Sequence, residues 1–192
     1  MTAQLTFFRQ LYSVFASRIP LAIAWLLCFL ASIGCPSDAY ADEAAEYTLK
    51  GAFLYNFALF TAWPEHTAEN FNLCIYGQDP FNRDLDLLMK KKSINERKVL
   101  VHRIGTLDQL DQCQMVFISR AAIGHLTKVI GALQDKPVLT VTDSPGASQH
   151  GAVLNMNVND DKVTFEANLI AARKAGLNLS SQLLRLATEV RQ

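Results

Sequence analysis

The sequence has no excess of charge of either sign: its 192 residues include 18 Lys and Arg against 18 Asp and Glu. Such a chain has no overall positive field to hold a nucleic acid backbone or an anionic membrane surface, which argues against general nucleic acid binding. Nine Gly and six Pro are ordinary usage, and no repeat period is present, which excludes collagen-like chains, solenoids and propellers. A chain that is 50% hydrophobic and 19% charged is expected to form a compact globular domain.

Motifs for catalysis and cofactors are also missing. The chain contains no HExxH, CxxC, GxGxxG or GxxxxGK[ST], so it offers no local signature for a metal, a dinucleotide or a phosphate loop. The segment GASQHG at 146–151 resembles a nucleophile elbow around Ser148, but His150 stands where that motif needs Gly. The four His are scattered and are expected to be solvated surface residues: His66, His102, His125 and His150. We therefore predict a protein without cofactor, metal or enzymatic activity, and an unrecognised hydrolase using Ser148 or His150 is the weakest alternative.

Acidic residues give no better catalytic pattern. Those at turns are ordinarily solvated structural residues, and this applies to Asp143, Asp160, Asp161 and Glu166. A phospho-receiver domain, which has a similar size and alternation of elements, needs an acceptor Asp at the end of its third strand. Here that strand ends in Ser119 and Arg120, so receiver chemistry fails at its essential residue.

An uncharged run near the N-terminus predicts export. Residues 19–33 read IPLAIAWLLCFLASI and follow Arg9 and Arg18, the pattern of a secretory signal peptide. The run is shorter than the roughly 20 apolar residues of a spanning helix, so a permanent transmembrane anchor is the weaker interpretation.

The predicted cleavage site lies between Ala41 and Asp42, because residues 39–41 place small side chains at the two positions that a signal peptidase reads. This divides the chain into a signal peptide, 1–41, and a single mature domain, 42–192. A rival cut before Cys35 would give a lipoprotein with Cys35 acylated. The protein is thus expected in the periplasm, with lipid anchoring as the alternative.

Two cysteines remain in the mature chain, Cys74 and Cys113. An even pair in an exported protein predicts a disulfide, and two unpaired buried thiols are the alternative.

The pattern from 43 to 63 predicts one helix ending at Pro64. Phe53, Phe57 and Phe60 recur at helical spacing, and further apolar residues up to Trp63 widen the apolar surface beyond one stripe. Either the domain buries this surface, or its aromatic side chains receive a ligand or a partner. In the second case Trp63 and Phe60 are the candidate pocket residues.

The middle of the chain alternates between strand and helix patterns, which predicts a parallel, doubly wound sheet. Strands are expected at 72–76, 98–104, 115–119 and 138–142, and helices from Phe81 to Met89 and from Ala121 to Leu133. If the sheet begins with strand order 2-1-3, the strand that holds Cys74 and the strand that Cys113 precedes are neighbours.

The last third predicts a hairpin and two short helices. Strands at 153–158 and 163–167 flank a polar turn, and a helix at 168–175 ends in basic residues before Gly176. Ser180 or Ser181 is expected to cap a final helix with a buried stripe of Leu183, Leu186 and Val190. The predicted fold is thus a three-layer α/β sandwich, receiver-like or Rossmann-like, with a mostly parallel sheet of about five to six strands and about five helices.

Three segments together resemble the YfiR family: KGAFLYNFALFTAWP at 50–64, CQMVFISR at 113–120 and FEANLIAARKAGLNLSSQLLRLA at 165–187. The resemblance implies a periplasmic domain that represses an inner-membrane signalling protein, in the best-known system a diguanylate cyclase. An outer-membrane lipoprotein relieves the repression by sequestering the YfiR-like protein. The expected output is the level of cyclic-di-GMP, exopolysaccharide and biofilm.

The resemblance also implies a homodimer and a disulfide between Cys74 and Cys113. Glu166 falls on the FExNL motif of the family, in a region that grips the lipoprotein, and Asn168 and Arg173 lie in the same block, so all three are candidate partner-binding residues. Asn168 and Arg173 have structural alternatives, as helix cap and helix C-terminus. The second cysteine pair of some relatives is missing here. The runner-up function is a periplasmic small-ligand-binding sensor subunit for another membrane receptor, such as a histidine kinase.

Overall fold

The computed structural model describes residues 38–64, 68–159 and 162–192, and the chain divides into two units, Met1–Ala41 and Asp42–Gln192. The predicted signal run at 19–33 and Cys35 lie outside the described residues. The predicted cleavage between Ala41 and Asp42 falls at the boundary between the units and stays a prediction.

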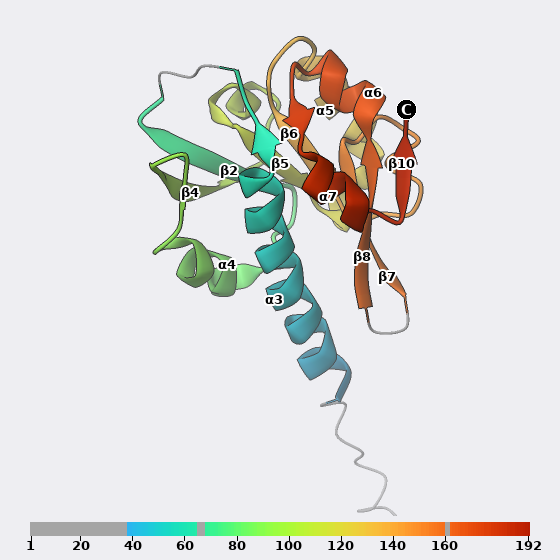
Figure 1. Cartoon of the computed structure of the whole chain (residues 1–192). Coiled ribbons are helices and arrows are strands. Elements are labelled where there is room, and N and C mark those ends of the chain that lie inside the picture. Colours follow the sequence, from blue (N-terminus) through green and yellow to red (C-terminus); the bar gives the residue numbers. More distant parts are fainter. Residues whose placement is uncertain (1–37, 65–67, 160–161) are drawn as a thin grey trace, which may run out of the picture. The chain divides into compact units, whose positions relative to one another are not determined.

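The second unit is built on an eight-stranded sheet with the order β10-β8-β7-β6-β5-β2-β4-β3 (Figure 1). From β4 to β7 neighbouring strands run parallel, whereas β8 is antiparallel to β7 and β3 is antiparallel to β4. The strands are β2 (Asn70–Tyr76), β3 (Ser93–Ile94), β4 (Arg97–Ile104), β5 (Met115–Ile118), β6 (Leu139–Thr142), β7 (Leu154–Asn159), β8 (Lys162–Asn168) and β10 (Glu189–Arg191). The mixed α/β class with a mostly parallel sheet is therefore confirmed, but the sheet is wider than the predicted five to six strands.

Helices cover both faces of this sheet. The described α-helices are α3 (Asp38–Leu59), α4 (Asn82–Met89), α5 (Leu126–Ala132), α6 (Leu169–Lys174) and α7 (Ser181–Leu186), with 3₁₀ helices η1 (Asp108–Gln112) and η2 (Arg120–His125). Successive residues of a strand point to opposite faces, and β5 shows the result: Phe117 belongs to one buried cluster and Val116 to another. The first cluster includes side chains of α3, α4, α6 and α7, and the second includes those of α5.

The predicted strand order is correct at the centre. The strand β2 pairs on one side with β4 and on the other with β5, which is the order 2-1-3 of a doubly wound sheet. All four residues of β5 and of β6 are buried, as expected for central parallel strands covered on both faces. The hairpin β7–β8 is also as predicted.

The first predicted helix is too long at its C-terminal end. It ends at Leu59, and Thr61–Ala62 instead forms β1, which pairs antiparallel with β9 (Asn178–Leu179) in a separate two-stranded sheet. The backbone N–H of Ser180 also donates to the Phe60 carbonyl at 2.9 Å. Hydrogen bonds to a segment more than 100 positions away replace the hydrogen bonds of the last predicted helical turn. The local sequence contains no pattern that predicts them.

The last predicted helix is also too long. The Ser180 hydroxyl caps α7 by accepting from the Leu183 N–H at 3.2 Å, as expected, and Leu183 is buried. However, α7 ends at Leu186, which is 66% exposed, and Val190 lies in β10, paired parallel to β8. The predicted helix 121–133 is divided between η2 and α5.

Candidate functional site

A disulfide joins Cys74 of β2 to Cys113, which lies just before the neighbouring strand β5. Their Cα atoms are 5.9 Å apart, and both residues are buried in the cluster that α5 covers. The bond ties the start of β5 to the middle of β2 and closes a loop with a sequence separation of 39.

A surface depression lies near the carboxyl ends of β5 and β6, between α3 and the β7–β8 hairpin. In parallel α/β sheets this edge is the usual place for ligand and partner contacts, because loops there leave neighbouring strands in different directions. Arg120 follows β5 and Asp143 follows β6, and both line the depression. We call it the Glu166 depression; its lining residues are Glu46, Arg120, Asp143, Pro145, Gly146, Asn157, Val158, Asn159 and Glu166.

A buried ion pair forms the floor of the Glu166 depression. The Lys50 Nζ of α3 lies 2.6 Å from Asp143 Oδ2, and both side chains are 0% exposed. The same ammonium reaches Glu46 Oε1 at 2.5 Å. Arg120 donates to the backbone carbonyl of Asp143 and lies 3.6 Å from its carboxylate. The expectation that Asp143 is a solvated turn residue is wrong, because it is 2% exposed and α3 and η2 bring two basic side chains, Lys50 and Arg120, onto it.

Tyr47, one residue from Glu46 on α3, completes this cluster. Its hydroxyl donates to Asp143 Oδ2 at 2.9 Å. Burial raises the pKa of Tyr47 well above its usual value, and the nearby Asp143 carboxylate raises that pKa further. The phenol therefore stays a donor. The other carboxylate oxygen, Asp143 Oδ1, is buried and has no hydrogen-bond partner among the described residues.

Glu166 lies on β8 at the rim of the depression, held by two donors. The Ser148 hydroxyl donates to Glu166 Oε2, and Asn157 Nδ2 donates to Glu166 Oε1 at 2.8 Å. Glu166 is half-buried, so its carboxylate is oriented by the protein yet reachable from outside. Ser148, by contrast, is 1% exposed.

Asn168 and Arg173 do not join Glu166 in the depression. Asn168 caps α6: its Oδ1 accepts from the Ala171 N–H at 2.8 Å, and its Nδ2 donates to the Ser148 carbonyl at 2.7 Å. Arg173 is exposed in the last turn of α6. The structure thus gives both residues the structural positions considered above, and their contact with a partner stays a prediction.

Trp63 and Phe60 lie near β1. The Trp63 indole N–H donates to the Gln114 carbonyl at 3.2 Å, and its ring packs edge-on against Phe71 with centroids 5.1 Å apart. Both Trp63 and Phe60 are partly buried and pack against the first core cluster. Neither lines the Glu166 depression, and their role as a pocket stays a prediction.

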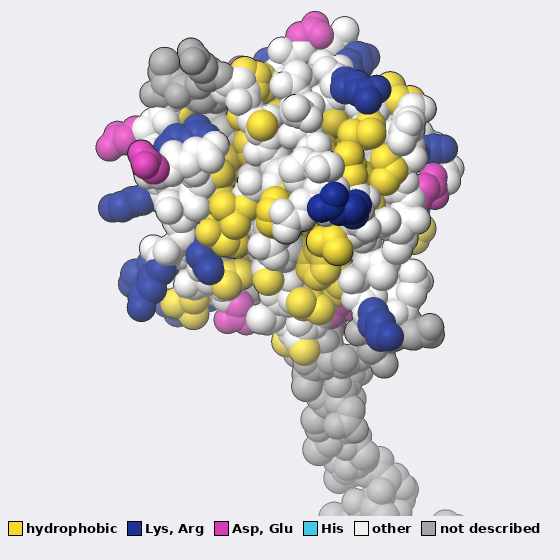
Figure 2. Space-filling view, viewed as in Figure 1, with side chains coloured by type: hydrophobic (Ala, Val, Ile, Leu, Met, Phe, Trp, Pro, Cys, Tyr) yellow, Lys and Arg dark blue, Asp and Glu magenta, His cyan; other side chains and the backbone are white. Residues whose placement is uncertain are grey.

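The sequence interpretation missed Lys50, Asp143 and Arg120. The one local signal was a lysine inside the apolar stretch YTLKGAFLY. A lysine that such a helix buries needs an acidic partner, because lysine is almost never fully buried unless it is paired. In the described part of the chain, no three His, Cys, Asp or Glu residues gather in a way that could hold a metal ion. On the face drawn in Figure 2, basic side chains are scattered among apolar ones instead of forming one patch.

A family model described as YfiR/HmsC-like, DUF4154, matches residues 47–188. The chain belongs to this family. The match contains both cysteines, the Lys50–Asp143 pair and Glu166. Among the described residues, no helix is both long enough and apolar enough to cross a membrane.

Two solved structures resemble the fold of the YfiR/HmsC-like chain in part. An ABC domain from Streptococcus pneumonia in complex with L-Trp has 8% identity and a TM-score of 0.48, covering 63% of this chain and 55% of that one. A conserved domain protein from Vibrio cholerae has 10% identity and a TM-score of 0.47, covering 75% of this chain and 60% of that one. The chain therefore spans little more than half the length of each.

Proposed function

We propose that this protein is a periplasmic, non-enzymatic regulator that binds the periplasmic domain of an inner-membrane signalling protein, a diguanylate cyclase, and represses it. The family match over residues 47–188 is the observation that carries this proposal. The disulfide supports the location, because such bonds persist in oxidising compartments such as the periplasm. Repression lowers cyclic-di-GMP and, with it, exopolysaccharide and biofilm.

Repression by a binding protein requires a difference in affinity between two states of the target. A regulator with equal affinity for the active and inactive conformations would shift nothing. Moving an equilibrium from mostly active to mostly inactive takes about 10⁴-fold tighter binding to the inactive state, or about 5.5 kcal/mol. A protein interface with a few well-ordered anchors supplies a difference of this size.

The Glu166 depression is the proposed contact surface. The Glu166 carboxylate accepts hydrogen bonds from Ser148 and Asn157, and each carboxylate oxygen has further acceptor capacity for a donor of the partner. Because the two donors already fix its orientation, little side-chain entropy is lost when a partner binds. An outer-membrane lipoprotein that occupies the same surface would relieve repression by simple competition.

The experiment is a pull-down from membranes with the purified, oxidised protein, followed by identification of the retained membrane protein and titration of its periplasmic domain. Glu166→Gln removes the charge but keeps the shape, and should weaken binding about tenfold or more, since a hydrogen bond to a charged group contributes about 1.5 to 3 kcal/mol. Glu69→Gln is the matched control. Glu69 is exposed and precedes β2 at the opposite edge of the sheet, so this variant should bind normally.

Retention of a diguanylate cyclase by the wild-type protein, with loss in Glu166→Gln, supports both the target and the surface. Equal retention by the two Glu variants would reject the Glu166 depression as the contact. Capture of another receptor class would reject the cyclase as the target. Reducing the disulfide before the pull-down tests whether its redox state gates repression, and light scattering tests the proposed homodimer.

A further inference from the structure

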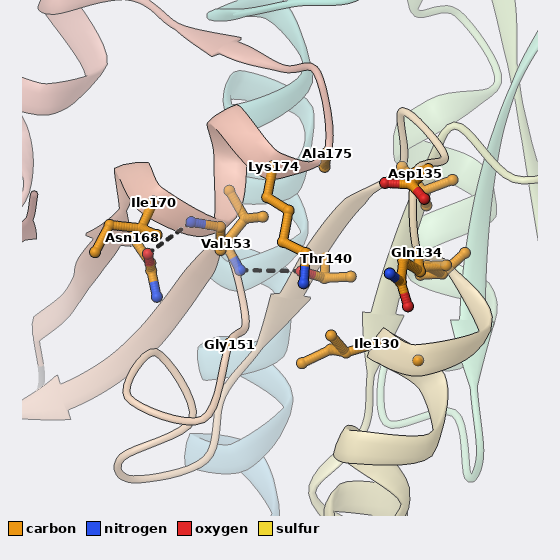
Figure 3. Close-up of a pocket in the computed structure, with 14 residues that line it drawn as sticks. Ile130, Gln134, Asp135, Thr140, Gly151, Val153, Asn168, Ile170, Lys174 and Ala175 are labelled. Carbon is orange, nitrogen blue, oxygen red and sulfur yellow. Dashed lines mark hydrogen bonds between the residues drawn. The ribbon is translucent and has the colours of Figure 1, made fainter.

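A second cavity, open to solvent on one side, lies between α5 and α6, beside β6 and the residue before β7 (Figure 3). It shares no lining residue with the Glu166 depression. The cavity has a volume of about 260 Å³. Its lining residues are Ile130, Gly131, Leu133, Gln134, Asp135, Val138, Thr140, Gly151, Val153, Asn168, Ile170, Ala171, Lys174 and Ala175.

The walls of this cavity are mostly apolar. Ile130 of α5 and Ile170 of α6 lie on opposite sides of it, and Val153 lies between them (Figure 3). Ile170 is 59% exposed, so its side chain lies at the open rim of the cavity. Apolar cavities of about 150 Å³ accept a benzene ring, so by proportion this one has room for about ten non-hydrogen atoms.

The opening carries a basic side chain with no assigned role. Lys174 extends from α6 into the space between α6 and β6 (Figure 3), and it makes no hydrogen bond or ion pair within the described ranges. The Thr140 hydroxyl accepts from the Val153 N–H at 3.0 Å, which leaves its hydrogen free to donate to a ligand. The one acid of the lining, Asp135, lies in the turn after α5 (Figure 3).

We propose that this cavity binds a small amphipathic monocarboxylate, with its chain or ring between α5 and α6 and its carboxylate at Lys174. A ligand chain of about eight carbons would cover the apolar lining and exclude water from it. The ammonium of Lys174 would pair with the ligand carboxylate. Thr140 donates to the second carboxylate oxygen. The proposal is independent of the function assigned to the Glu166 depression.

The test is calorimetric titration of the full oxidised protein with octanoate, octanamide and octylammonium, three probes with the same chain and different head groups. Octanoate should bind saturably, with a dissociation constant below about 1 mM for a ligand of this size. Octanamide should bind at least about fivefold more weakly, because it lacks the charge that pairs with Lys174, and octylammonium should bind least.

Two further measurements locate the ligand. Lys174→Gln should weaken octanoate at least about fivefold and leave octanamide unchanged, whereas Lys128→Gln, an exposed lysine on α5 outside the lining, should change neither. Nuclear Overhauser contacts should connect the octanoate chain to the methyl groups of Ile130 and Val153.

The proposal would be overturned by no saturable binding of octanoate at 10 mM, by octanoate contacts to methyl groups elsewhere, or by stronger binding of octylammonium. The last result would place the head group at Asp135. Equal loss of octanoate binding in the two Lys variants would reject the specific role of Lys174.

Discussion

Replacing Lys50 with Met should destabilise the protein by about 3 kcal/mol, because it leaves the Asp143 carboxylate buried without its main cationic partner. The pair is 2.6 Å apart and both side chains are 0% exposed. Removing one member of such a pair costs about 3 to 5 kcal/mol. The lower end applies here, since Arg120 lies 3.6 Å from the same carboxylate and compensates in part, although its own side chain is 60% exposed and screened by water.

The assay is equilibrium unfolding of the oxidised protein in urea, followed by far-ultraviolet circular dichroism. With a dependence of about 2 kcal/mol per molar urea for a domain of this size, the midpoint should fall by about 1.5 M. Lys136→Met is the matched control. Lys136 also pairs with an aspartate, Asp111, at 2.5 Å, but the two side chains are 42% and 68% exposed. Such a surface pair contributes at most about 1 kcal/mol.

A double variant separates the pair from simple packing effects. Asp143→Asn removes the buried negative charge, so adding it to Lys50→Met should cost less than the two single changes added together. The reasoning would be refuted if Lys50→Met shifted the midpoint no more than Lys136→Met, or if the two changes at the buried pair were additive.

Three further predictions concern other parts of the fold. Reducing the disulfide should lower the free energy of unfolding by roughly 4 kcal/mol, because the unfolded chain gains entropy when its loop is released. Unfolding curves with and without reductant measure this difference, and an unchanged midpoint would contradict the prediction. Asn168→Ala should lower the free energy of unfolding by about 2 kcal/mol in the same assay, because it removes the cap of α6 and leaves the Ser148 carbonyl without its donor. Asn168→Asp keeps the cap acceptor and should lower it less. Hydrogen bonds from Arg103 lower the pKa of Asp86 below its ordinary 3.8, so this pair stabilises the fold above that pH and loses its contribution as the pH falls through the lowered pKa. In Arg103→Gln the free energy of unfolding should therefore fall less steeply than in the wild type between pH 5 and 2. The expected difference is under about 1 kcal/mol, because both side chains are part-exposed. Identical pH profiles for wild type and variant would count against this prediction.

Much of the central fold could be predicted because its signals are local. Buried parallel strands produce short continuous apolar runs, and β5 and β6 were found by them. Caps act within one helical turn, and Asn168 and Ser180 both accept the N–H bonds expected of them. The disulfide followed from an even pair of cysteines and from a strand order that makes β2 and β5 neighbours.

The errors lie where distant segments compete with local preference. The predicted helix continues through Thr61 because no helix breaker stands before Pro64, but pairing with Leu179 ends the helix earlier. Val190 fits a helical stripe, yet its backbone joins the edge of the sheet beside Ala167. In both places hydrogen bonds to another strand replace those of the helix.

The candidate site shows the same division. Glu166 could be singled out from the family resemblance, whereas the donors that orient it, Ser148 and Asn157, are known only from the fold. Asp143 reads as a turn acid in sequence, and only the packing of α3 against the end of β6 places Lys50 on it.

By itself, the sequence determined the family, the α/β class, the buried central strands and the helix caps, because motifs, periodicity and capping act over a few residues. Only the tertiary structure decided where helices end, which charges are buried together and where cavities open. Helix ends, buried charge pairs and cavities all depend on contacts between segments far apart in the chain. The free energy of these contacts depends on which segments pack together, and the sequence around a single residue does not specify that.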